Sequence, residues 1–403
     1  MGWIKAGRSG RWLVIAAVSA LTAAEGCGSD GGNTGGAGGT SSSTTGSGGA
    51  ANGGGAGGTG GAPAVTCLDA STHASLFTIA DTSLCAVAVY EADEEIGYQL
   101  PTWGTHGGPL VMQPGAGGVI TLQRWTPPSA STGKLTKQAT NVTTQIPANA
   151  FVGGTAVDLP FFGWTAIAWT GSFPDTVGEI VMIKGSTVDR SYAVNGAFSM
   201  AGVGDATGGR LLFSGLSPIG AVATDVNGFY AADACDMPSQ DLGTGTGCQA
   251  SAEVAAWGDS SGAVAVDHDG NAFVVLASFA TGDQEARGYA AAEVARGAKA
   301  TAGKSLFTLP GFGSSLAAIT PKGGKPGLLV FQPLDSTATA LDVIAQPYTV
   351  TAGINVQDTP RKLLTLAASA PSLYLMTDTT DRLWVAASGK GKSTFVVLDR
   401  KNP

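Results

Sequence analysis

Short β-prone runs alternate with turns of Gly, Asp, Asn and Pro through residues 64–403, and the spacing of these turns sets the strictest limit on the fold. Six hairpin turns centre near residues 116, 175, 227, 269, 323 and 379, so the gaps between them are 42–59 residues. One four-stranded propeller blade takes about 40–50 residues plus loops. A lone hairpin cannot bury its own faces, whereas a ring of neighbouring sheets can. The spacing therefore predicts an all-β propeller of six or seven blades.

Three passages look like copies of one unit, namely Val222–Tyr230, Val264–Val275 and Leu375–Val385. Each reads as a strand, an Asp-led polar turn and a strand that carries an aromatic residue. Asp and Asn suit the turn because their side chains bond to the nearby backbone and because they tolerate a left-handed φ. A repeated unit of this kind supports the prediction of blades.

The two ends of this region predict how the ring closes. We expect an extra hairpin around Leu76 to Tyr90, and we expect Phe395–Leu398 to supply a strand to a blade shared by both ends of the chain. Tandem β-sandwiches are the competing architecture. The repeat is too short for sandwich domains of about 100 residues and continues through the middle of the chain, which favours the propeller.

Residues 1–26 have the pattern of a secretory signal peptide. Lys5, Arg8 and Arg11 precede the apolar run Trp12–Ala24, which is shorter than the roughly 20 residues that a membrane helix needs. The segment Ala24-Glu25-Gly26-Cys27 is similar to a bacterial lipobox, although Ala24 stands where Leu is usual. Cleavage after Ala24 without lipidation is the alternative.

Residues 27–63 predict a lipidated Cys27 followed by a flexible linker. Residues 28–62 hold 17 Gly and otherwise Ser, Thr, Ala, Asn and Asp, without a large apolar side chain. Such a segment cannot bury enough surface to offset its ordering entropy. We therefore expect a tether that presents residues 64–403 as one propeller domain at the cell envelope, with the outer membrane as the site of anchoring.

Five cysteines are an odd number for an exported protein, and lipidation of Cys27 would leave four. An oxidising compartment favours disulfides among Cys67, Cys85, Cys235 and Cys248. Three connectivities are possible, and short loops favour Cys67–Cys85 with Cys235–Cys248.

Charge limits the partners of the chain. The sequence has 22 Lys and Arg against 30 Asp and Glu, a formal net charge of −8. No basic surface is available to neutralise nucleic-acid phosphates or anionic headgroups, so we expect no nucleic-acid partner and membrane contact through the lipid only. We expect a monomer.

The signal peptide, the Cys, the Gly-rich tether and the Asp-turn hairpins together resemble exported bacterial lipoproteins that carry a β-propeller. The hairpins are similar to those of NHL and gluconolactonase-like propellers, whose turns follow the pattern D-x-x-G-N, as in Asp267 to Asn271. The resemblance implies the fold and no particular activity, because propellers include enzymes, binders and scaffolds.

Candidate chemistry is sparse. Asp267, Asp269 and Asn271 alternate as oxygen ligands of Ca²⁺ might, but Ser278 stands where a calcium loop would need its last acidic residue. The segment Gly258–Gly262 fits G-x-S-x-G, but a strand-like run follows it where a nucleophile elbow needs a helix. Solvated or structural turns are the favoured interpretation of both. We also expect the tryptophans of the body to be buried between blades rather than exposed for stacking on sugars.

The sequence favours a tethered, non-catalytic binding module whose ligand is a protein or a glycan. We expect no cofactor, and Ca²⁺ at Asp267, Asp269 and Asn271 is the less favoured alternative. The alternative is an exported hydrolase or lactonase-like enzyme with acidic residues at the central channel. Convergent carboxylates around one cavity would favour the enzyme.

The lipid prediction can be tested with a Cys27→Ser variant expressed in a bacterium that exports the chain. We expect the unsubstituted protein to enter the detergent phase on Triton X-114 partitioning and the variant to stay in the aqueous phase, since only acyl chains can hold so acidic a protein on a bilayer. Equal partitioning of the two proteins would contradict lipidation at Cys27.

Overall fold

The computed structural model describes fifteen stretches of the chain, all within the unit Ala62–Pro403. The described residues are 65–96, 101–147, 151–159, 163–170, 178–194, 197–205, 208–216, 227–234, 250–256, 260–277, 284–295, 303–309, 312–333, 341–367 and 372–401. In this part of the chain there is no helix long and apolar enough to cross a membrane.

The described strands form six sheets, which we number I to VI along the chain. Sheet I contains β3 (Thr102–Gly104), β4 (Gly108–Pro114), β5 (Val119–Thr126) and β7 (Thr136–Thr143). Sheet II contains β8 (Phe151–Leu159), β9 (Trp164–Thr170), β10 (Gly178–Lys184) and β11 (Thr187–Val194). Sheet III contains β12 (Ala197–Asp205), β13 (Gly208–Leu216), β14 (Asn227–Ala234) and β15 (Ala250–Ala256).

The second half of the chain continues the pattern. Sheet IV contains β16 (Ser260–Val266), β17 (Ala272–Ala277), β18 (Gln284–Tyr289) and β19 (Lys304–Leu309). Sheet V contains β20 (Phe312–Ile319), β21 (Gly327–Pro333), β22 (Leu341–Val350), β23 (Ile354–Val356), β24 (Arg361–Leu366) and β1 (Phe77–Ile79). Sheet VI contains β25 (Ser372–Thr377), β26 (Leu383–Gly389), β27 (Lys392–Arg400), β2 (Leu84–Ala92) and β6 (Thr132–Lys134). Three short 3₁₀ turns, η1 (Ala70–His73), η2 (Ala116–Gly118) and η3 (Ala291–Glu293), complete the described elements.

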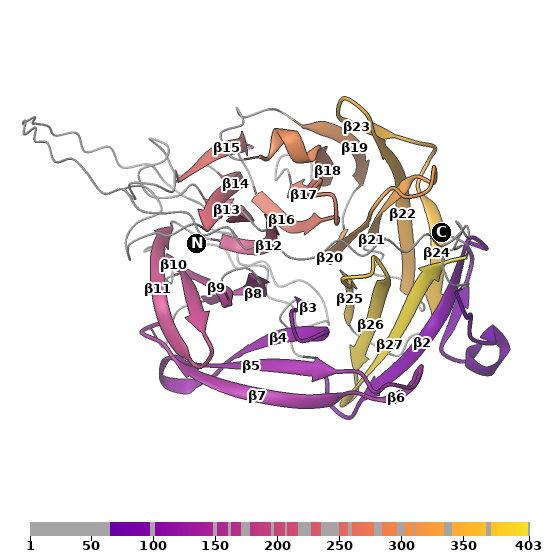
Figure 1. The fold of residues 1–403 in the computed structure, drawn as a ribbon, viewed down its shortest axis with the longest axis horizontal. Helices are drawn as coiled ribbons and strands as arrows, with labels where there is room; N and C mark the ends of the chain where they lie inside the picture. Colours follow the sequence, from indigo (N-terminus) through magenta and orange to yellow (C-terminus); the bar gives the residue numbers. More distant parts are fainter. Residues whose placement is uncertain are drawn as a thin grey trace, which may run out of the picture. The chain divides into compact units, whose positions relative to one another are not determined.

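The six sheets surround a common centre (Figure 1). Each sheet has one innermost strand, which is the strand named first for it above. These inner strands contact one another in the order β3, β8, β12, β16, β20 and β25, and β25 contacts β3 again. This closed circuit of inner strands is the arrangement of a β-propeller. The all-β propeller prediction is therefore confirmed, and the tandem β-sandwich alternative is wrong.

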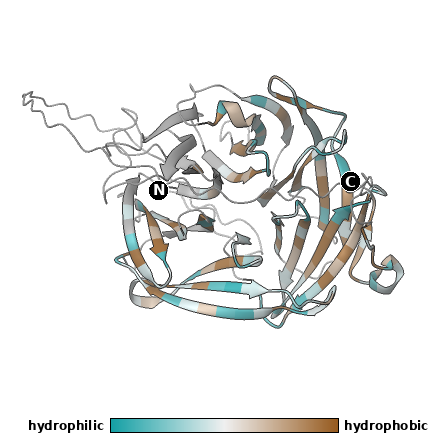
Figure 2. Ribbon diagram, in the orientation of Figure 1, coloured by the Kyte–Doolittle hydropathy of each residue, from teal (hydrophilic) through white to brown (hydrophobic). Residues whose placement is uncertain are grey.

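The apolar core lies in the gaps between neighbouring sheets rather than inside any one of them. Leu110, Met112 and Leu122 of sheet I pack with Ile167 and Val181 of sheet II, and these five side chains are all but inaccessible to solvent. Similar clusters join sheets IV and V, V and VI, and VI and I. Hydrophobic residues recur along the strands for this reason (Figure 2). Each sheet needs both of its neighbours to bury its two faces.

The ring is closed by strands from both ends of the body. β2 pairs with β27 in antiparallel register from Leu84 opposite Arg400 to Ala92 opposite Ser393. The expectation that Phe395–Leu398 lies in a sheet shared by both ends is confirmed. The expected hairpin at Leu76–Tyr90 is wrong, because β1 pairs with β24 of sheet V while β2 joins sheet VI. Pairing with distant strands overrides the local hairpin pattern.

A second clasp joins sheets VI and I. The chain leaves sheet I after β5, and β6 pairs in parallel with β2 from Val89 opposite Thr132 to Glu91 opposite Lys134. It then returns to sheet I as β7, so that sheet I contributes a strand to sheet VI. Lys134 lies 2.7 Å from the Asp93 carboxylate on the same side of the junction.

The predicted hairpins occur at two different positions within the sheets. The turns near 269, 323 and 379 join the first and second strands of sheets IV, V and VI, whereas those near 116 and 175 join the second and third strands of sheets I and II. The predicted turn at Asn227-Gly228 is wrong, because both residues lie in β14, opposite Leu216 and Gly215 of β13. The ladder holds this dipeptide extended although it favours tight turns.

Hydroxyl groups join the inner strands of successive sheets. In each case a Ser or Thr on one inner strand bonds to the backbone of the inner strand that follows. The four contacts are Thr102 Oγ1 to Ala156 O at 2.5 Å, Met200 N to Thr155 Oγ1 at 2.8 Å, Val264 N to Ser199 Oγ at 3.1 Å and Leu375 N to Ser315 Oγ at 2.6 Å. We call these contacts the hydroxyl latches. An inner strand has one edge without a neighbouring strand, and the latches satisfy polar groups along that edge.

Among the described inner strands, β16 and β25 carry neither Ser nor Thr at the latch position. The position that corresponds to Thr155 and Ser199, one residue before the latched backbone group, is Ala263 in β16 and Tyr374 in β25. The junction of sheets IV and V is bridged instead at a turn, where His268 N donates to Thr320 Oγ1 at 2.9 Å. The junction of sheets VI and I is bridged at the periphery by β6.

Replacement of Thr155 by Val tests the energetic role of a latch. Thr155 is buried, and the isosteric change leaves the amide of Met200 without its acceptor. We expect a loss of about 1–3 kcal/mol in the free energy of unfolding, measured by urea denaturation. Thr308→Val, at an exposed site on β19, is the matched control and is expected to change stability by less than about 0.5 kcal/mol. Equal effects of the two substitutions would contradict the role of the latch.

Candidate functional site

The described residues of the six inner strands line a central cavity of about 180 Å³ that is open to solvent. Most of its wall is small or apolar, with residues such as Ala201, Ala265 and Ala318. The four latch residues also line it, but their hydroxyls already bond to backbone groups. The wall therefore offers apolar side chains and polar groups in similar measure, and the latch hydroxyls among the polar groups already have partners.

Asp158 is the one carboxylate among the described residues that line this cavity. Its side chain is only 4% exposed and lies between sheets I and II. Oδ2 accepts hydrogen bonds from Thr105 N at 2.9 Å and Thr105 Oγ1 at 3.0 Å, and Oδ1 accepts one from Thr165 Oγ1 at 2.6 Å. The guanidinium of Arg124 lies 3.5 Å from Oδ1. Because both oxygens are engaged and the charge is balanced, Asp158 acts as a connection between two sheets.

The turn Asp267–Asn271 is organised by its first carboxylate. Asp267 Oδ1 accepts from the amides of Asp269 and Asn271 at 3.0 and 2.9 Å. Asp267 Oδ2 accepts from Asn271 Nδ2 at 2.8 Å and from the hydroxyl of Tyr348 at 2.7 Å. N–H and O–H donors thus occupy the carboxylate that was considered as a Ca²⁺ ligand, and Asp269 is exposed. Within the described part of the chain no three His, Cys, Asp or Glu residues gather as a metal site.

The turn Asp378–Arg382 repeats this design. Asp378 Oδ1 accepts from the amides of Thr380 and Arg382 at 2.8 and 3.0 Å, and Oδ2 accepts from Trp384 Nε1 at 2.9 Å. Gly270 in the first turn and Asp381 in the second occupy the same position with φ of 83° and 69°. The predicted likeness of these two passages is confirmed in their hydrogen bonds. The third passage, Val222–Tyr230, lies partly outside the described residues.

Three turns meet on one side of the cavity, and we call them the turn face: Asp267–Asn271, Thr320–Pro326 and Asp378–Arg382. The Thr320 amide donates to Asp381 Oδ1 at 2.9 Å, and a ring nitrogen of His268 lies 2.7 Å from the Asp378 carbonyl oxygen. Val266, Ala318 and Thr377, which lie just before these turns or within two residues of them, line the cavity. The turn face is therefore continuous with the cavity wall.

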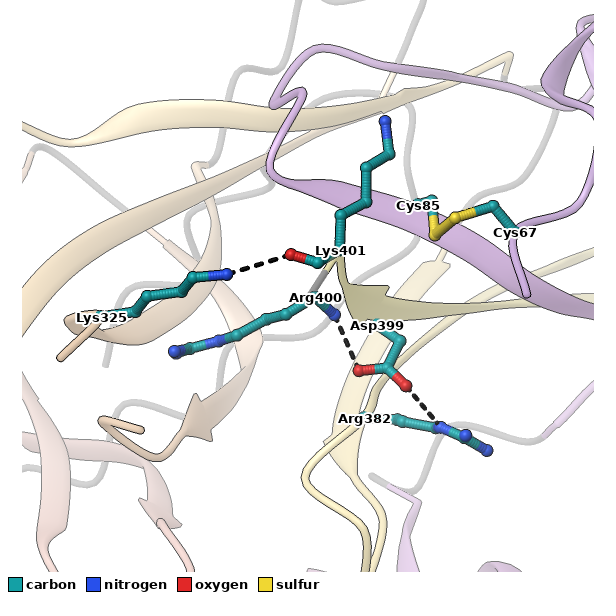
Figure 3. Close-up of a disulfide and its surroundings, with 7 residues drawn as sticks. All are labelled: Cys67, Cys85, Lys325, Arg382, Asp399, Arg400 and Lys401. Atoms are coloured by element: carbon teal, nitrogen blue, oxygen red, sulfur yellow. Dashed lines mark hydrogen bonds and ion pairs between the residues drawn. A yellow bond between two sulfur atoms is a disulfide. The ribbon is translucent and has the colours of Figure 1, made fainter. Parts of the chain in front are cut away.

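Of the remaining candidate residues from the sequence, the structure describes some and leaves others outside the described part of the chain. Cys67 and Cys85 form a disulfide, as predicted (Figure 3). Cys27, Cys235 and Cys248 lie outside the described residues, and so do the signal peptide and the linker. Ser260 and Ser261 pair with Ala277 and Leu276 in the β16–β17 ladder, whereas a nucleophile elbow would place the serine at a strand-to-helix turn.

The tryptophans of the described body are buried or half-buried. Trp125, Trp164, Trp169 and Trp384 are at most 9% exposed, and Trp103 is half-buried with its ring 4.8 Å from that of Trp384. Val188 is the one large hydrophobic side chain that is exposed among the described residues. Trp257 lies outside them. An aromatic platform for sugars is therefore not formed by the tryptophans that the structure describes.

Sequence reasoning missed Asp158, Arg124 and the hydroxyl latches. Asp158 lies in a strand beside a short apolar run and carries no motif, and its partners come from another sheet. The latches have a faint signal, since Thr155, Ser199 and Ser315 each stand two residues before a Val or Ala of an inner strand. That signal becomes visible only when the inner strands are known.

No protein-family model matches the sequence, and no curated protein matches it. Several solved structures are similar in fold. A glucose dehydrogenase is 13% identical, with 78% of this chain and 98% of that chain covered and a TM-score of 0.44. Hydrazine synthase of Kuenenia stuttgartiensis is 11% identical over 73% and 74%, with a TM-score of 0.42, and Drosophila Semaphorin 1b is 9% identical over 74% and 72%, with a TM-score of 0.39. Similarity at this level concerns the fold alone.

The buried Asp267 makes stability depend on pH. Burial raises its pKa above the ordinary value, although hydrogen bonds from Asn271 and Tyr348 act in the opposite direction. The folded state therefore binds the proton more readily than the unfolded state. The resulting stability is complete below the unfolded pKa of about 3.8 and is lost as the pH rises through the folded pKa.

Asp267→Asn removes the titrating group and one acceptor oxygen. We therefore expect its free energy of unfolding to lie further below that of the unsubstituted protein at pH 4 than at pH 7. Urea denaturation at the two pH values measures both margins. Asp269→Asn, at the exposed carboxylate of the same turn, is the control. A margin that narrows on acidification would show that the pKa of Asp267 is not raised.

Proposed function

We propose that this protein is an exported, lipid-tethered binding module that has no catalytic activity. Its resemblance to exported lipoproteins with NHL or gluconolactonase-like propellers rests on the signal peptide, Cys27, the Gly-rich linker and the Asp-led turns. In this proposal the six described sheets are the six blades, and the linker presents them at the outer membrane.

The observation that carries the proposal is the chemistry of the central cavity. A hydrolase that works by acid–base catalysis needs a carboxylate free to exchange a proton or to hold a metal. Asp158 is the only carboxylate in the described wall, and Arg124, Thr105 and Thr165 engage both of its oxygens. A wall that offers shape without a free acid or base supports binding over turnover.

The turn face is the proposed contact surface, and a folded protein is the proposed partner. His268, Asp269, Lys322, Thr379 and Thr380 are exposed there, while hydrogen bonds hold the backbone of the three turns in place. A preorganised polar surface of this kind loses little entropy on association. A glycan is the less favoured ligand because the described tryptophans are turned inwards.

The test uses the full chain with Cys27→Ser, immobilised and exposed to detergent-solubilised cell envelopes. We expect it to retain a specific protein. Asp269→Arg with Thr379→Arg should reduce retention at least 10-fold, because both substitutions place a large charge on exposed tips of the turn face. Val188→Arg, at an exposed site on the outer strand β11, is the control and should retain the protein fully.

Two results would overturn the proposal. One is retention that the turn-face substitutions leave unchanged. The other is hydrolysis of esters or lactones by the purified protein that Asp158→Asn abolishes, which would establish the alternative of a lactonase-like enzyme.

A further inference from the structure

Thr320, which begins the turn between β20 and β21, is bonded to both of the other turns of the turn face. Its amide donates to the Asp381 carboxylate, at 2.9 Å from Oδ1 and 3.2 Å from Oδ2. Its Oγ1 donates to Asp381 Oδ1 at 3.1 Å and accepts from His268 N at 2.9 Å. One hydroxyl can do both because it has a proton to donate and two lone pairs. Thr320 therefore joins the turns of sheets IV and VI to the turn of sheet V.

Arg400, at the end of β27, fixes the same turn from below. One of its guanidinium nitrogens donates to Thr320 O at 3.1 Å and to Pro326 O at 2.8 Å, so it holds both ends of the turn. Arg400 is 8% exposed, and Figure 3 shows its side chain extending from β27 towards Lys325. Hydrogen bonds from a charged donor are stronger than those between neutral groups. The turn of sheet V is thus attached to sheet VI at two places.

His268 completes a closed set of contacts among the three turns. Its amide reaches Thr320 in the turn of sheet V, and its ring nitrogen Nε2 lies 2.7 Å from the Asp378 carbonyl oxygen in the turn of sheet VI. Each turn therefore contacts the other two. Asp267 and Asp378 shape their own turns by bonds to nearby amides, so the contacts at Thr320 and His268 determine how the turns are placed relative to one another.

The backbone of Asp381 indicates that its side chain is used for this placement. Asp381 has a φ of 69°, which is uncommon for residues other than Gly, and the matching residue of the turn in sheet IV is Gly270 with a φ of 83°. Glycine adopts this conformation more readily, but it has no carboxylate that Thr320 could bond to. The side chain that the second turn carries at this position is the one that bonds to the neighbouring sheet.

Thr320 is too buried to contact a partner, since it is 7% exposed. The exposed residues of the turn face, such as Asp269 and Thr379, lie in the turns on either side of it. If these turns moved independently, a partner that contacts both would have to restrict their motion on binding. Fixing the surface in advance removes that entropy loss.

We propose that Thr320 is the positioning residue of the turn face: it holds the turns of sheets IV, V and VI as one rigid surface, so that a partner recognises a single epitope that spans three sheets. This inference deepens the proposed function and rests on it, because it concerns binding at the same face. It assigns control of binding to a buried residue that acts through Asp381 and His268.

The first test measures amide exchange and needs no partner. In the full chain with Cys27→Ser, Thr320→Val removes the hydroxyl and keeps the shape of the side chain. We expect the His268 amide to exchange about 10-fold faster, as the loss of one hydrogen bond would produce. The amides of Asn271 and Arg382 bond within their own turns and should change less than about threefold. Hydrogen–deuterium exchange resolved to single residues measures these rates, and Thr320→Ser should restore the original rate.

The second test measures retention of the envelope protein by the immobilised chain. We expect Thr320→Val to reduce retention roughly 10-fold and Thr320→Ser to recover most of it, because serine keeps the hydroxyl. Thr365→Val is the matched control, since Thr365 Oγ1 donates to Asp342 Oδ1 at 2.6 Å between outer strands of the same sheet. A general loss of stability would affect both Val variants alike, whereas a positioning role affects only Thr320→Val.

A second variant tests the same link from its other side. Asp381→Gly suits the φ of 69° and removes the carboxylate. We expect the Thr320 amide to exchange about 10-fold faster in this variant. Because Asp381→Gly and Thr320→Val break the same link, the double variant should lose little more retention than either single variant.

Three results would overturn the positioning role: unchanged exchange of the His268 amide in Thr320→Val, an equal loss of retention in Thr365→Val, or fully additive losses in the double variant. Failure of the unsubstituted chain to retain any envelope protein would instead overturn the proposed function. The exchange rates of the His268 and Thr320 amides would still decide whether Thr320 holds the three turns together.

Discussion

The backbone groups on the free edges of six inner strands must find partners where the sheets meet, and the rest of the fold depends on how this is done. A buried N–H or C=O without a partner costs about as much as a hydrogen bond contributes, so a bare inner edge would weaken every junction. Four junctions use a Ser or Thr from the preceding sheet. The same hydroxyls line the central cavity. The groups that stabilise the junctions therefore also determine which polar groups the cavity wall contains.

That coupling bears on function. The latch hydroxyls are bonded to the backbone, and Arg124 and two threonines engage the carboxylate of Asp158. These groups therefore have little capacity left for proton transfer. Next to the cavity, the turn face carries exposed polar side chains, and Asp267 and Asp378 use both of their carboxylate oxygens to hold the shape of its turns. The described hydroxyls at the axis thus stabilise the ring, whereas the polar side chains of the turn face are exposed. This division supports a binding role.

Local chemistry was enough to predict the elements but not their partners. The turns at Asp267 and Asp378 follow from side chains that bond within five residues, and Cys67–Cys85 follows from a short loop in an oxidising compartment. By contrast, Asn227-Gly228 has the composition of a turn and lies in a strand, because β13 pairs with it. The separation of β1 from β2, the clasp by β6 and the contacts of Asp158 depend on residues tens to hundreds of positions away. Turn spacing cannot encode such contacts, since it records only neighbours along the chain.

The exchange of β6 between sheets also affects how such a ring can evolve. Sheet I contributes β6 to sheet VI, and sheets V and VI each pair strands from opposite ends of the body. A repeat at this end of the ring therefore cannot be duplicated or deleted without separating paired strands. The junctions between sheets II, III and IV are crossed by an uninterrupted chain with one latch each. Gain or loss of a whole repeat would be accommodated there, so relatives of different circumference should keep the first and last sheets and differ in the middle.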